Sequence, residues 1–166
     1  MVRIGVISDT HLPDTGEARA LLRDIAVQHF SGVELILHAG DIVVPDVLSA
    51  FAPCAVYGVR GNMDPAAPGI PHKRVISVAG LRIGLIHGWG APAGLAGRIL
   101  GEFAGTPLDC LVFGHSHVPE SRRAGGLLLF NPGSATACRG LPQASVGLLE
   151  IDNGAIRGKI LPLGVA

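Results

Sequence analysis

Side chains able to bind a metal ion stand just after five short apolar runs of this sequence. The seven residues are Asp9, His11, Asp41, Asn62, His87, His115 and His117. Each run is short and rich in β-branched or other apolar residues, which predicts a β-strand. In open α/β sheets, ligands bind beyond the carboxyl ends of the strands. We therefore expect the seven side chains to meet in one cleft.

The donor types of these seven residues fit one kind of site. Imidazole nitrogens combined with carboxylate and amide oxygens, without a thiolate, suit divalent ions such as Mn, Fe, Ni, Co or Zn. Seven donors are too many for one tetrahedral ion, but they would serve two ions that share a carboxylate. Two ions about 3.5–4 Å apart activate water as a nucleophile and neutralise phosphate oxygens. The set therefore predicts hydrolysis of phosphate esters.

Each member of the set also has a structural interpretation. A single histidine at a strand end is more often a packed or surface residue than a ligand, and D-x-H or H-x-H alone is a weak pattern. The ordered series D-x-H, G-D, G-N, H and G-H-x-H is far more specific than any of its parts. The metal interpretation therefore depends on the whole series.

In this order the five blocks resemble those of the calcineurin-like metallophosphoesterases. The matching segments are Asp9-x-His11, Gly40-Asp41, Gly61-Asn62, His87 and Gly114-His115-x-His117. The segment Asn131-Pro-Gly-Ser134 and the small size resemble the compact prokaryotic, YfcE-like phosphodiesterase subgroup. The resemblance covers nearly the whole chain. It implies a four-layer αββα sandwich of two mixed β-sheets flanked by helices, the metallo-dependent phosphatase fold, with the site at the sheet edge.

The resemblance also implies a role for each ligand. The first ion would be held by Asp9, His11 and His117. Asp41 would bridge the two ions, and the second ion would be held by Asn62, His87 and His115. Asp41 and Asn62 would be the catalytic residues, with Asn62 also touching the substrate phosphate. The cofactors would be two divalent transition-metal ions, with Mn favoured and Ni, Co, Fe or Zn as alternatives.

Two positions depart from the family pattern. The G-N block often continues with His or Cys, whereas Met63 stands here. A thioether cannot protonate a leaving group, so we expect the chemistry to depend on the metal centre and on good leaving groups. Where relatives often have a second histidine after His87, this chain has Trp89. Trp89 is either a wall of the substrate pocket or a packed side chain.

Other polar residues near these blocks have two interpretations each. Arg60 is a candidate to hold a phosphate oxygen, for which a guanidinium is suited, or it is an ordinary exposed arginine. Asp64 orients a ligand or caps a turn. His38 lies two residues before the G-D block, where packing is favoured over a role at the site. Ser134 approaches the cleft or shapes a turn, and with no His–Asp pair assigned to it we do not expect a nucleophile.

The same pattern of apolar runs predicts the elements that position the site. The predicted strands span 2–8, 34–38, 55–59, 74–79, 81–87, 109–113, 127–130, 145–151 and 155–161. Helical periodicity is clearest over 16–30, and 46–51 and 93–103 are weaker candidates. Gly-containing turns near residues 80, 126 and 154 predict hairpins. Strands alternate with helices in the first half, which favours an α/β fold.

Composition excludes several other classes of protein. The chain has 166 residues, which predicts a single domain spanning 1–166. It is 48% hydrophobic and 16% charged, too apolar for a disordered chain. Thirteen basic side chains balance thirteen acidic ones, so no nucleic-acid patch is expected. No apolar run approaches the length of a membrane span. Cys54, Cys110 and Cys138 form no CxxC motif, and we expect a cytoplasmic protein.

Together these features predict a dinuclear metal-dependent phosphoesterase, favoured as a phosphodiesterase. It would hydrolyse a small phosphate ester by in-line attack of a hydroxide that bridges the two ions. The alternative is a non-catalytic scaffold for protein interactions on the same fold, like the retromer scaffold subunit. A scaffold has no chemical need for all seven ligands, which argues for the enzyme. The family resemblance also favours a homo-oligomer, either a dimer or a tetramer.

Overall fold

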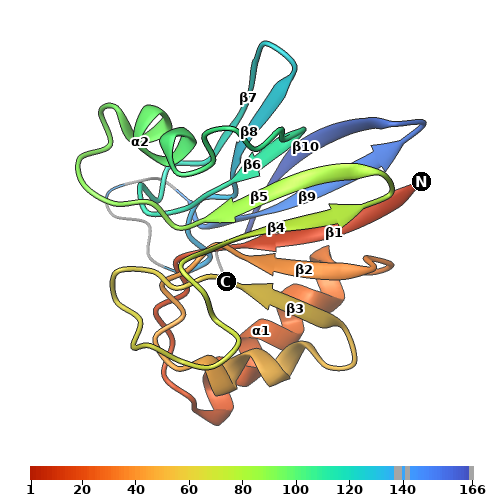
Figure 1. The fold of residues 1–166 in the computed structure, drawn as a ribbon. Coiled ribbons are helices and arrows are strands. Elements are labelled where there is room, and N and C mark those ends of the chain that lie inside the picture. Colours follow the sequence, from red (N-terminus) through yellow and green to blue (C-terminus); the bar gives the residue numbers. More distant parts are fainter. Residues whose placement is uncertain (137–139, 141–142, 165–166) are drawn as a thin grey trace.

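Two five-stranded mixed sheets form the centre of the computed structural model, which describes residues 1–136, 140 and 143–164. The first sheet has the order β10-β9-β1-β2-β3. Its strands are β1 (Val2–Ile7), β2 (Leu35–His38), β3 (Ala55–Gly58), β9 (Ser145–Asp152) and β10 (Ala155–Pro162). β1, β2 and β3 are parallel, and β9 and β10 add antiparallel neighbours. Figure 1 shows this sheet beside the second one.

The second sheet has the order β4-β5-β6-β8-β7. Its strands are β4 (Lys73–Val78), β5 (Leu81–Ile86), β6 (Cys110–Val112), β7 (Glu120–Ala124) and β8 (Leu127–Asn131). β5, β6 and β8 are parallel at the centre, and the edge strands β4 and β7 run antiparallel to their neighbours. The predicted turns near 80, 126 and 154 are confirmed as the connections β4–β5, β7–β8 and β9–β10.

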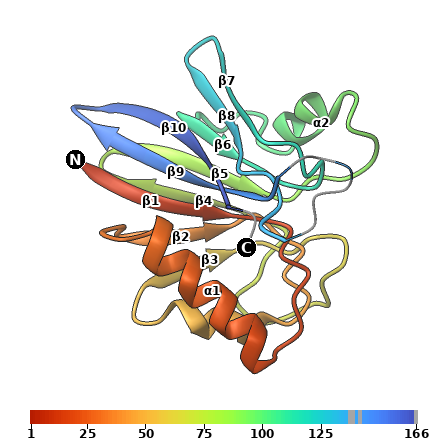
Figure 2. The same cartoon turned by 180° about the vertical axis from the view of Figure 1, so that it is seen from behind.

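Helices cover the outer faces of the two sheets, which completes the expected four layers (Figure 2). α1 (Gly16–His29) and the 3-10 helix η1 (Pro45–Phe51) pack on the first sheet, and α2 (Leu95–Gly101) packs on the second. The Thr15 side chain caps α1 by accepting a hydrogen bond from Ala18 N at 3.2 Å. None of the described helices is long and apolar enough to span a membrane.

The apolar core lies in three layers, one between the sheets and one under each helical face. β1 contributes to two of them: Val6 points between the sheets, whereas Ile7 packs with α1 and η1. Burial on both faces explains why the central strands are almost uninterrupted apolar runs. A sequence of this kind specifies the sandwich because neither sheet could expose such a strand to water.

The strand register brings the site residues to one edge. Ile7 pairs with His38, and His38 with Gly58, so the loops after β1, β2 and β3 leave the first sheet at the same level. Across the sandwich, Leu85 of β5 pairs with Val112 of β6. The loops after these two strands therefore emerge together as well.

Three sequence predictions need correction. β7 was not predicted, because its residues are mostly charged and exposed and an edge strand needs no apolar pattern. The segment 46–51 forms a 3-10 helix that begins at Pro45. The helix expected over 93–103 is shorter, because Gly94 before it adopts a left-handed conformation (φ 73°) and turns follow Gly101. Cys138 lies outside the described residues.

Candidate metal centre

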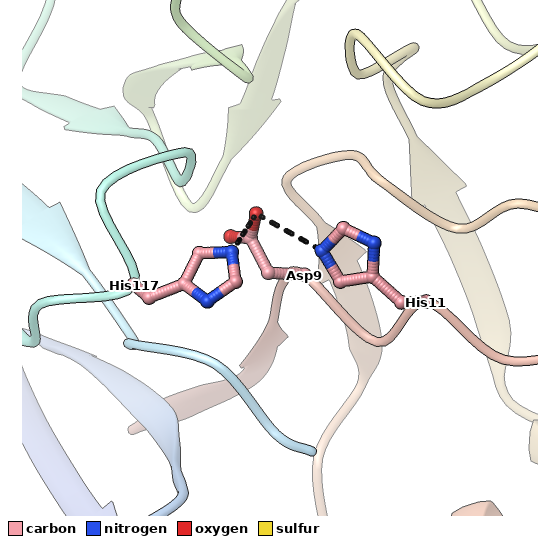
Figure 3. A group of neighbouring side chains, drawn as sticks. All are labelled: Asp9, His11 and His117. Atoms are coloured by element: carbon pink, nitrogen blue, oxygen red, sulfur yellow. Dashed lines mark ion pairs between the residues drawn. The ribbon is translucent and has the colours of Figure 1, made fainter. Parts of the chain in front are cut away.

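Asp9, His11 and His117 form a cluster that we call the inner group. Asp9 and His11 follow β1, and His117 follows β6 on the other sheet. The Asp9 Oδ1 atom lies 3.2 Å from His117 Nε2 and 3.9 Å from His11 Nε2, as Figure 3 shows. One ligand atom from each of the three residues lies within 4.8 Å of the others. Asp9 and His117 are buried.

Asp41 contacts both His11 of this inner group and His87, which follows β5 of the second sheet. Its Oδ2 atom is 3.5 Å from His11 Nε2 and 3.4 Å from His87 Nε2. His87 Nε2 is also 3.8 Å from Asp9 Oδ1, so Asp9, Asp41 and His87 form a second potential metal-binding set. The two sets share Asp9, and Asp41 Oδ2 faces imidazoles on both sides.

The remaining expected ligands, with His87, form what we call the outer group: Asn62, His87 and His115. Asn62 Oδ1 is 3.0 Å from His87 Nε2 and 3.3 Å from His115 Nδ1. Asn62 is exposed and His115 is partly exposed, whereas His87 is buried. All seven residues singled out by the sequence therefore lie in one continuous cluster at the sheet edge.

Backbone carbonyl groups orient two of the imidazoles. His87 Nδ1 lies 2.7 Å from Ala39 O, and His115 Nε2 lies 2.8 Å from Gly90 O. A carbonyl oxygen only accepts, so each of these nitrogens carries a hydrogen. In a neutral ring the opposite nitrogen then directs a lone pair at Asn62 Oδ1, and His87 directs it at Asp41 as well. Lone pairs that face oxygen acceptors need a cation or a proton between them.

The two carboxylates are held ionised inside the protein. Burial raises the pKa of Asp9, but His117, His87 and Ser8 lower it by more, and the net shift is downward. Burial likewise acts against ionisation of Asp41, yet His87, the Met63 amide and His11 bring its pKa to about 2. His87 shows the reciprocal effect, because its two carboxylate neighbours outweigh burial and raise its pKa. Two buried negative charges this close require compensating positive charge.

The unsatisfied atoms of the cluster test whether a metal fits there. Within the described part of the chain, Asp9 Oδ1 and His11 Nε2 are buried and make no hydrogen bond. Buried polar atoms normally have a partner. An anionic oxygen and an imidazole nitrogen without one, both facing the same space, are the donors that a divalent transition metal takes. The residues present therefore fit divalent cations.

Five of the seven residues have left-handed backbone conformations, which non-glycine residues rarely adopt. The φ angles are 52° for Asp9, 48° for His11, 55° for Asp41, 69° for His115 and 61° for His117. Such conformations cost about 1–3 kcal/mol each and concentrate at functional sites. The fold therefore accepts strain to turn these side chains toward one point.

Glycines of the motifs allow the loops to approach one another. A Cβ atom on Gly114 would lie 2.7 Å from Asp9 Oδ2 and would overlap the Ser8 hydroxyl. A Cβ atom on Gly61 would overlap the Asp41 carboxylate. Gly114 lets the loop after β6 approach Asp9 on the opposite sheet, and Gly61 lets the loop after β3 approach Asp41 within the first sheet.

The structure resolves the roles of several polar neighbours. Asp64 accepts hydrogen bonds from Val43 N at 2.6 Å and Gly61 N at 2.8 Å, so it ties two ligand-bearing loops together. Ser134 donates to Asp9 O at 2.9 Å, which shapes the loop rather than supplying a nucleophile. Sequence reasoning missed Ser8, which donates to Asp9 Oδ2 at 2.6 Å. Its position directly before D-x-H was the only available signal.

His38 is a packed histidine and not a member of the cluster. Its Nδ1 accepts from Gly40 N at 3.2 Å, and its Nε2 lies 3.1 Å from Thr10 Oγ1. Complete burial lowers its pKa to about 4, against the smaller opposing effects of Asp9 and Asp64. A neutral ring is what this bonding requires, because the Gly40 amide needs a lone pair on Nδ1.

Comparison with known proteins identifies the family to which this fold belongs. The family model described as the calcineurin-like phosphoesterase superfamily domain matches residues 2–154. A probable metallophosphoesterase of Methanothermobacter thermautotrophicus is 41% identical over 97% of this chain and 92% of its own length. The chain belongs to the calcineurin-like phosphoesterase superfamily. Its relatives' names indicate hydrolysis of phosphate esters, and the cluster provides candidate residues for the divalent metals of that family.

Solved structures share the fold at lower identity. A chain described as a novel archaeal phosphodiesterase superposes with a TM-score of 0.73 at 20% identity, covering 96% of this chain and all (100%) of that one. Vps29 of Entamoeba histolytica, solved in complex with Zn²⁺, gives a TM-score of 0.67 at 26% identity. That alignment covers 97% of this chain and 99% of that chain.

Proposed function

We propose that this protein is a phosphodiesterase that works with two divalent metal ions. The observation that supports it most directly is the convergence of two ionised, buried carboxylates with imidazole nitrogens from both sheets. The inner group of Asp9, His11 and His117 would hold one ion, and the outer group of Asn62, His87 and His115 the other. Asp41 Oδ2, almost equidistant from His11 and His87, would bridge them.

Bound ions would activate water as the nucleophile and neutralise charge on the phosphate oxygens. The chain's own residues then have distinct tasks. Asn62 turns its Oδ1 toward the two histidines, which leaves its amide Nδ2 to donate to a phosphate oxygen. Arg60 lies beside Asn62 in the same pocket and would bind a second phosphate oxygen. These two contacts would hold the ester for in-line attack.

The lack of a proton donor at Met63, beside Asn62, favours esters with good leaving groups. Met63 is exposed next to Asn62 and offers no acidic proton to a departing alkoxide. The leaving group must therefore be stable as an anion or receive its proton from water. A pocket beside the centre also has room for the second ester group, which a monoester lacks. Mn²⁺ is the favoured ion, with Ni, Co, Fe and Zn as alternatives.

The test is a metal-reconstitution assay. Protein stripped with a chelator is supplied with Mn, Ni, Co, Zn or Mg, and turnover of bis(p-nitrophenyl) phosphate and p-nitrophenyl phosphate is compared. We expect metal-dependent hydrolysis that prefers the diester, with two ions per chain by elemental analysis. Asp41→Asn should lower the rate about a thousandfold, since bridging charge of this kind is worth several kcal/mol. Activity that survives metal removal would contradict the proposal.

The scaffold alternative draws support from the likeness to Vps29, which is also a metal-binding chain of this fold. The enzyme needs the seven ligands for catalysis, whereas a scaffold does not. A scaffold would keep its partner binding after Asp41→Asn and would show no turnover with any ion. We further propose a cytoplasmic homo-oligomer, either a dimer or a tetramer, acting on a small phosphate ester. Light scattering on the purified protein measures the oligomeric state.

A further inference from the structure

A pocket of about 190 Å³ opens directly beside the candidate metal centre. Its lining residues are Arg60, Gly61, Asn62, His72, Gly88 and Trp89. Asn62 belongs to the outer group, and Gly88 follows His87 in the chain. A group seated in this pocket would therefore lie within bonding reach of a phosphate at the centre.

Two aromatic rings form one wall of this pocket. Trp89, the single tryptophan of the chain, exposes 37% of its surface. Its ring centre lies 6.1 Å from that of His72, with the planes inclined by 44°. Exposed aromatic faces beside a phosphate site are the feature that binds nucleobases by stacking. Trp89 is exposed where it lines the pocket, so a planar group seated there would lie beside the indole.

The loop that bears Trp89 is held in place from two sides. The Arg98 guanidinium of α2 donates to Trp89 O at 2.9 and 3.1 Å, to Ala93 O at 2.9 Å and to Ala91 O. In the same loop, Gly90 O accepts from His115 Nε2. The backbone that carries Trp89 is thus held relative to His115, a candidate ligand, before any substrate arrives. Such preorganisation lowers the entropic cost of binding.

The charge of Arg60 and the volume of the pocket limit which ligands can bind there. Arg60 supplies a cation at the pocket, suited to a phosphate oxygen of the same molecule. Pockets that enclose whole drug-sized ligands measure roughly 300–1,000 Å³, so this pocket takes only one ring-sized group. A planar base joined through its sugar to a phosphodiester meets both conditions.

We propose that this pocket binds the nucleobase of a small nucleotide phosphodiester, with Trp89 as the stacking surface. The proposal rests on the proposed function for the hydrolytic step. In that step water forms a new bond to phosphorus, the P–O bond to the leaving alcohol breaks, and the nucleoside monophosphate remains. The pocket would select the ester group that is retained.

A matched pair of substrates tests the proposal. Thymidine 5′-(p-nitrophenyl phosphate) and ethyl p-nitrophenyl phosphate release the same leaving group and differ in the retained ester. The quantity measured is the ratio of their kcat/KM values. We expect a ratio well above one in the native protein, and a drop of about tenfold in Trp89→Ala, the equivalent of one stacked base. Trp89→Phe should keep most of the preference.

The control variant is Tyr57→Ala, which removes an aromatic side chain of similar exposure that packs under Arg74 outside the pocket. It should leave the ratio unchanged. The proposal is overturned if Trp89→Ala lowers both kcat/KM values equally, or if Tyr57→Ala changes the ratio as much.

A binding measurement separates this proposal from the proposed function. Because Trp89 is the single tryptophan, intrinsic fluorescence reports on the pocket even in metal-free protein. Thymidine 5′-monophosphate should change the emission saturably, 2-deoxyribose 5-phosphate should not, and Arg60→Ala should weaken the effect. Binding without turnover would refute the phosphodiesterase and keep the base pocket. Metal-dependent turnover combined with the same fluorescence change for both phosphates would refute the base pocket and keep the phosphodiesterase.

Discussion

The inner and outer groups of the candidate centre are built differently. The inner residues Asp9, His11 and His117 all have left-handed backbones, and Asp9 and His117 are almost inaccessible to water. In the outer group, Asn62 is exposed, and His87 and His115 are aimed by hydrogen bonds to backbone carbonyls. The inner group thus lies where the two sheets meet, whereas the outer group combines the buried His87 with the exposed Asn62, which lines the pocket. If each group holds an ion, as proposed, the inner group would mainly retain its ion and the outer group would meet the substrate.

Removing one imidazole from each group should separate these tasks. We expect His117→Ala to lower kcat about a thousandfold and to reduce bound metal, since the loss leaves the ionised Asp9 without its nearest imidazole. His115→Ala should cost about 10–100-fold, and excess metal should recover part of it. Elemental analysis and metal titration of the rate give both quantities. If both variants lose kcat equally and added metal restores neither, the two groups do not have separate tasks.

Two of the buried histidines, His38 beside the centre and His87 within it, have pKa values shifted in opposite directions. His38 has its pKa lowered to about 4, so the unfolded chain binds a proton first as the pH falls below about 6.5. Stability from this residue is complete above pH 6.5 and is lost toward pH 4, by on the order of 3 kcal/mol.

Urea unfolding of metal-free protein at several pH values measures this loss. His38→Gln, which keeps polar groups near Thr10 and Gly40, should flatten the dependence between pH 6.5 and 4 relative to the native chain. If the native protein and the His38→Gln variant lose the same unfolding free energy between pH 6.5 and 4, His38 is not the residue responsible for the loss. The comparison of variants cancels the titration of His87, whose pKa moves upward.

The crowding between the sheets can be tested with a pair of glycines. Gly114→Ala forces a methyl group against Asp9 and Ser8, and we expect a loss of about 2 kcal/mol in unfolding free energy together with weaker metal binding. Gly97→Ala in α2 meets nothing within 4 Å and should stabilise by about 0.5–1 kcal/mol. Thermal unfolding reports both. A Gly114 variant as stable as the native chain would refute the close approach.

The smallest expected effect is a gain in rate from a substitution next to Asn62, the exposed member of the outer group. Met63→His introduces a proton donor next to Asn62, where the side chain is open to solvent. For esters with basic leaving groups we expect about a tenfold higher kcat, with little change for p-nitrophenol esters. A series of aryl diesters of increasing phenol pKa measures the slope of rate against leaving group. An unchanged slope would show that Met63 does not limit the reaction.

Much of the fold could be predicted because the central strands are buried on both faces. Such strands are apolar where they are buried, and the sequence shows this directly over residues 4–7 of β1 and 83–86 of β5. β7 escaped prediction because an exposed edge strand can consist of charged residues. The 3-10 character of η1 also depended on packing, since a short segment after Pro45 has no clear period.

At the site, too, some features could be predicted from the sequence and others could not. The seven candidate ligands were visible in the sequence, because an imidazole, carboxylate or amide after each of five apolar runs is a local feature of residue type and spacing. The bond of Ser8 to Asp9 was not visible, and for Asp64 the sequence left ligand orientation and turn capping open, because both depend on a hydrogen-bond geometry that spacing does not define. For Trp89 the sequence left a pocket wall and a packed side chain open. The structure places it with Arg60 and His72 around one pocket, which spacing does not reveal because the three come from separate loops.

The sequence by itself determined the buried strands, the helix over 16–29 and the donor atoms that follow the strands, because periodicity and side-chain chemistry are local properties. Only the tertiary structure decided which nitrogen of His87 faces the centre. That choice depends on Ala39 O, a carbonyl on the opposite sheet's loop that no local pattern links to the histidine. The structure likewise decided that Asp41 Oδ2 lies between His11 and His87, since the distance between residues from two sheets follows from how the sheets pack.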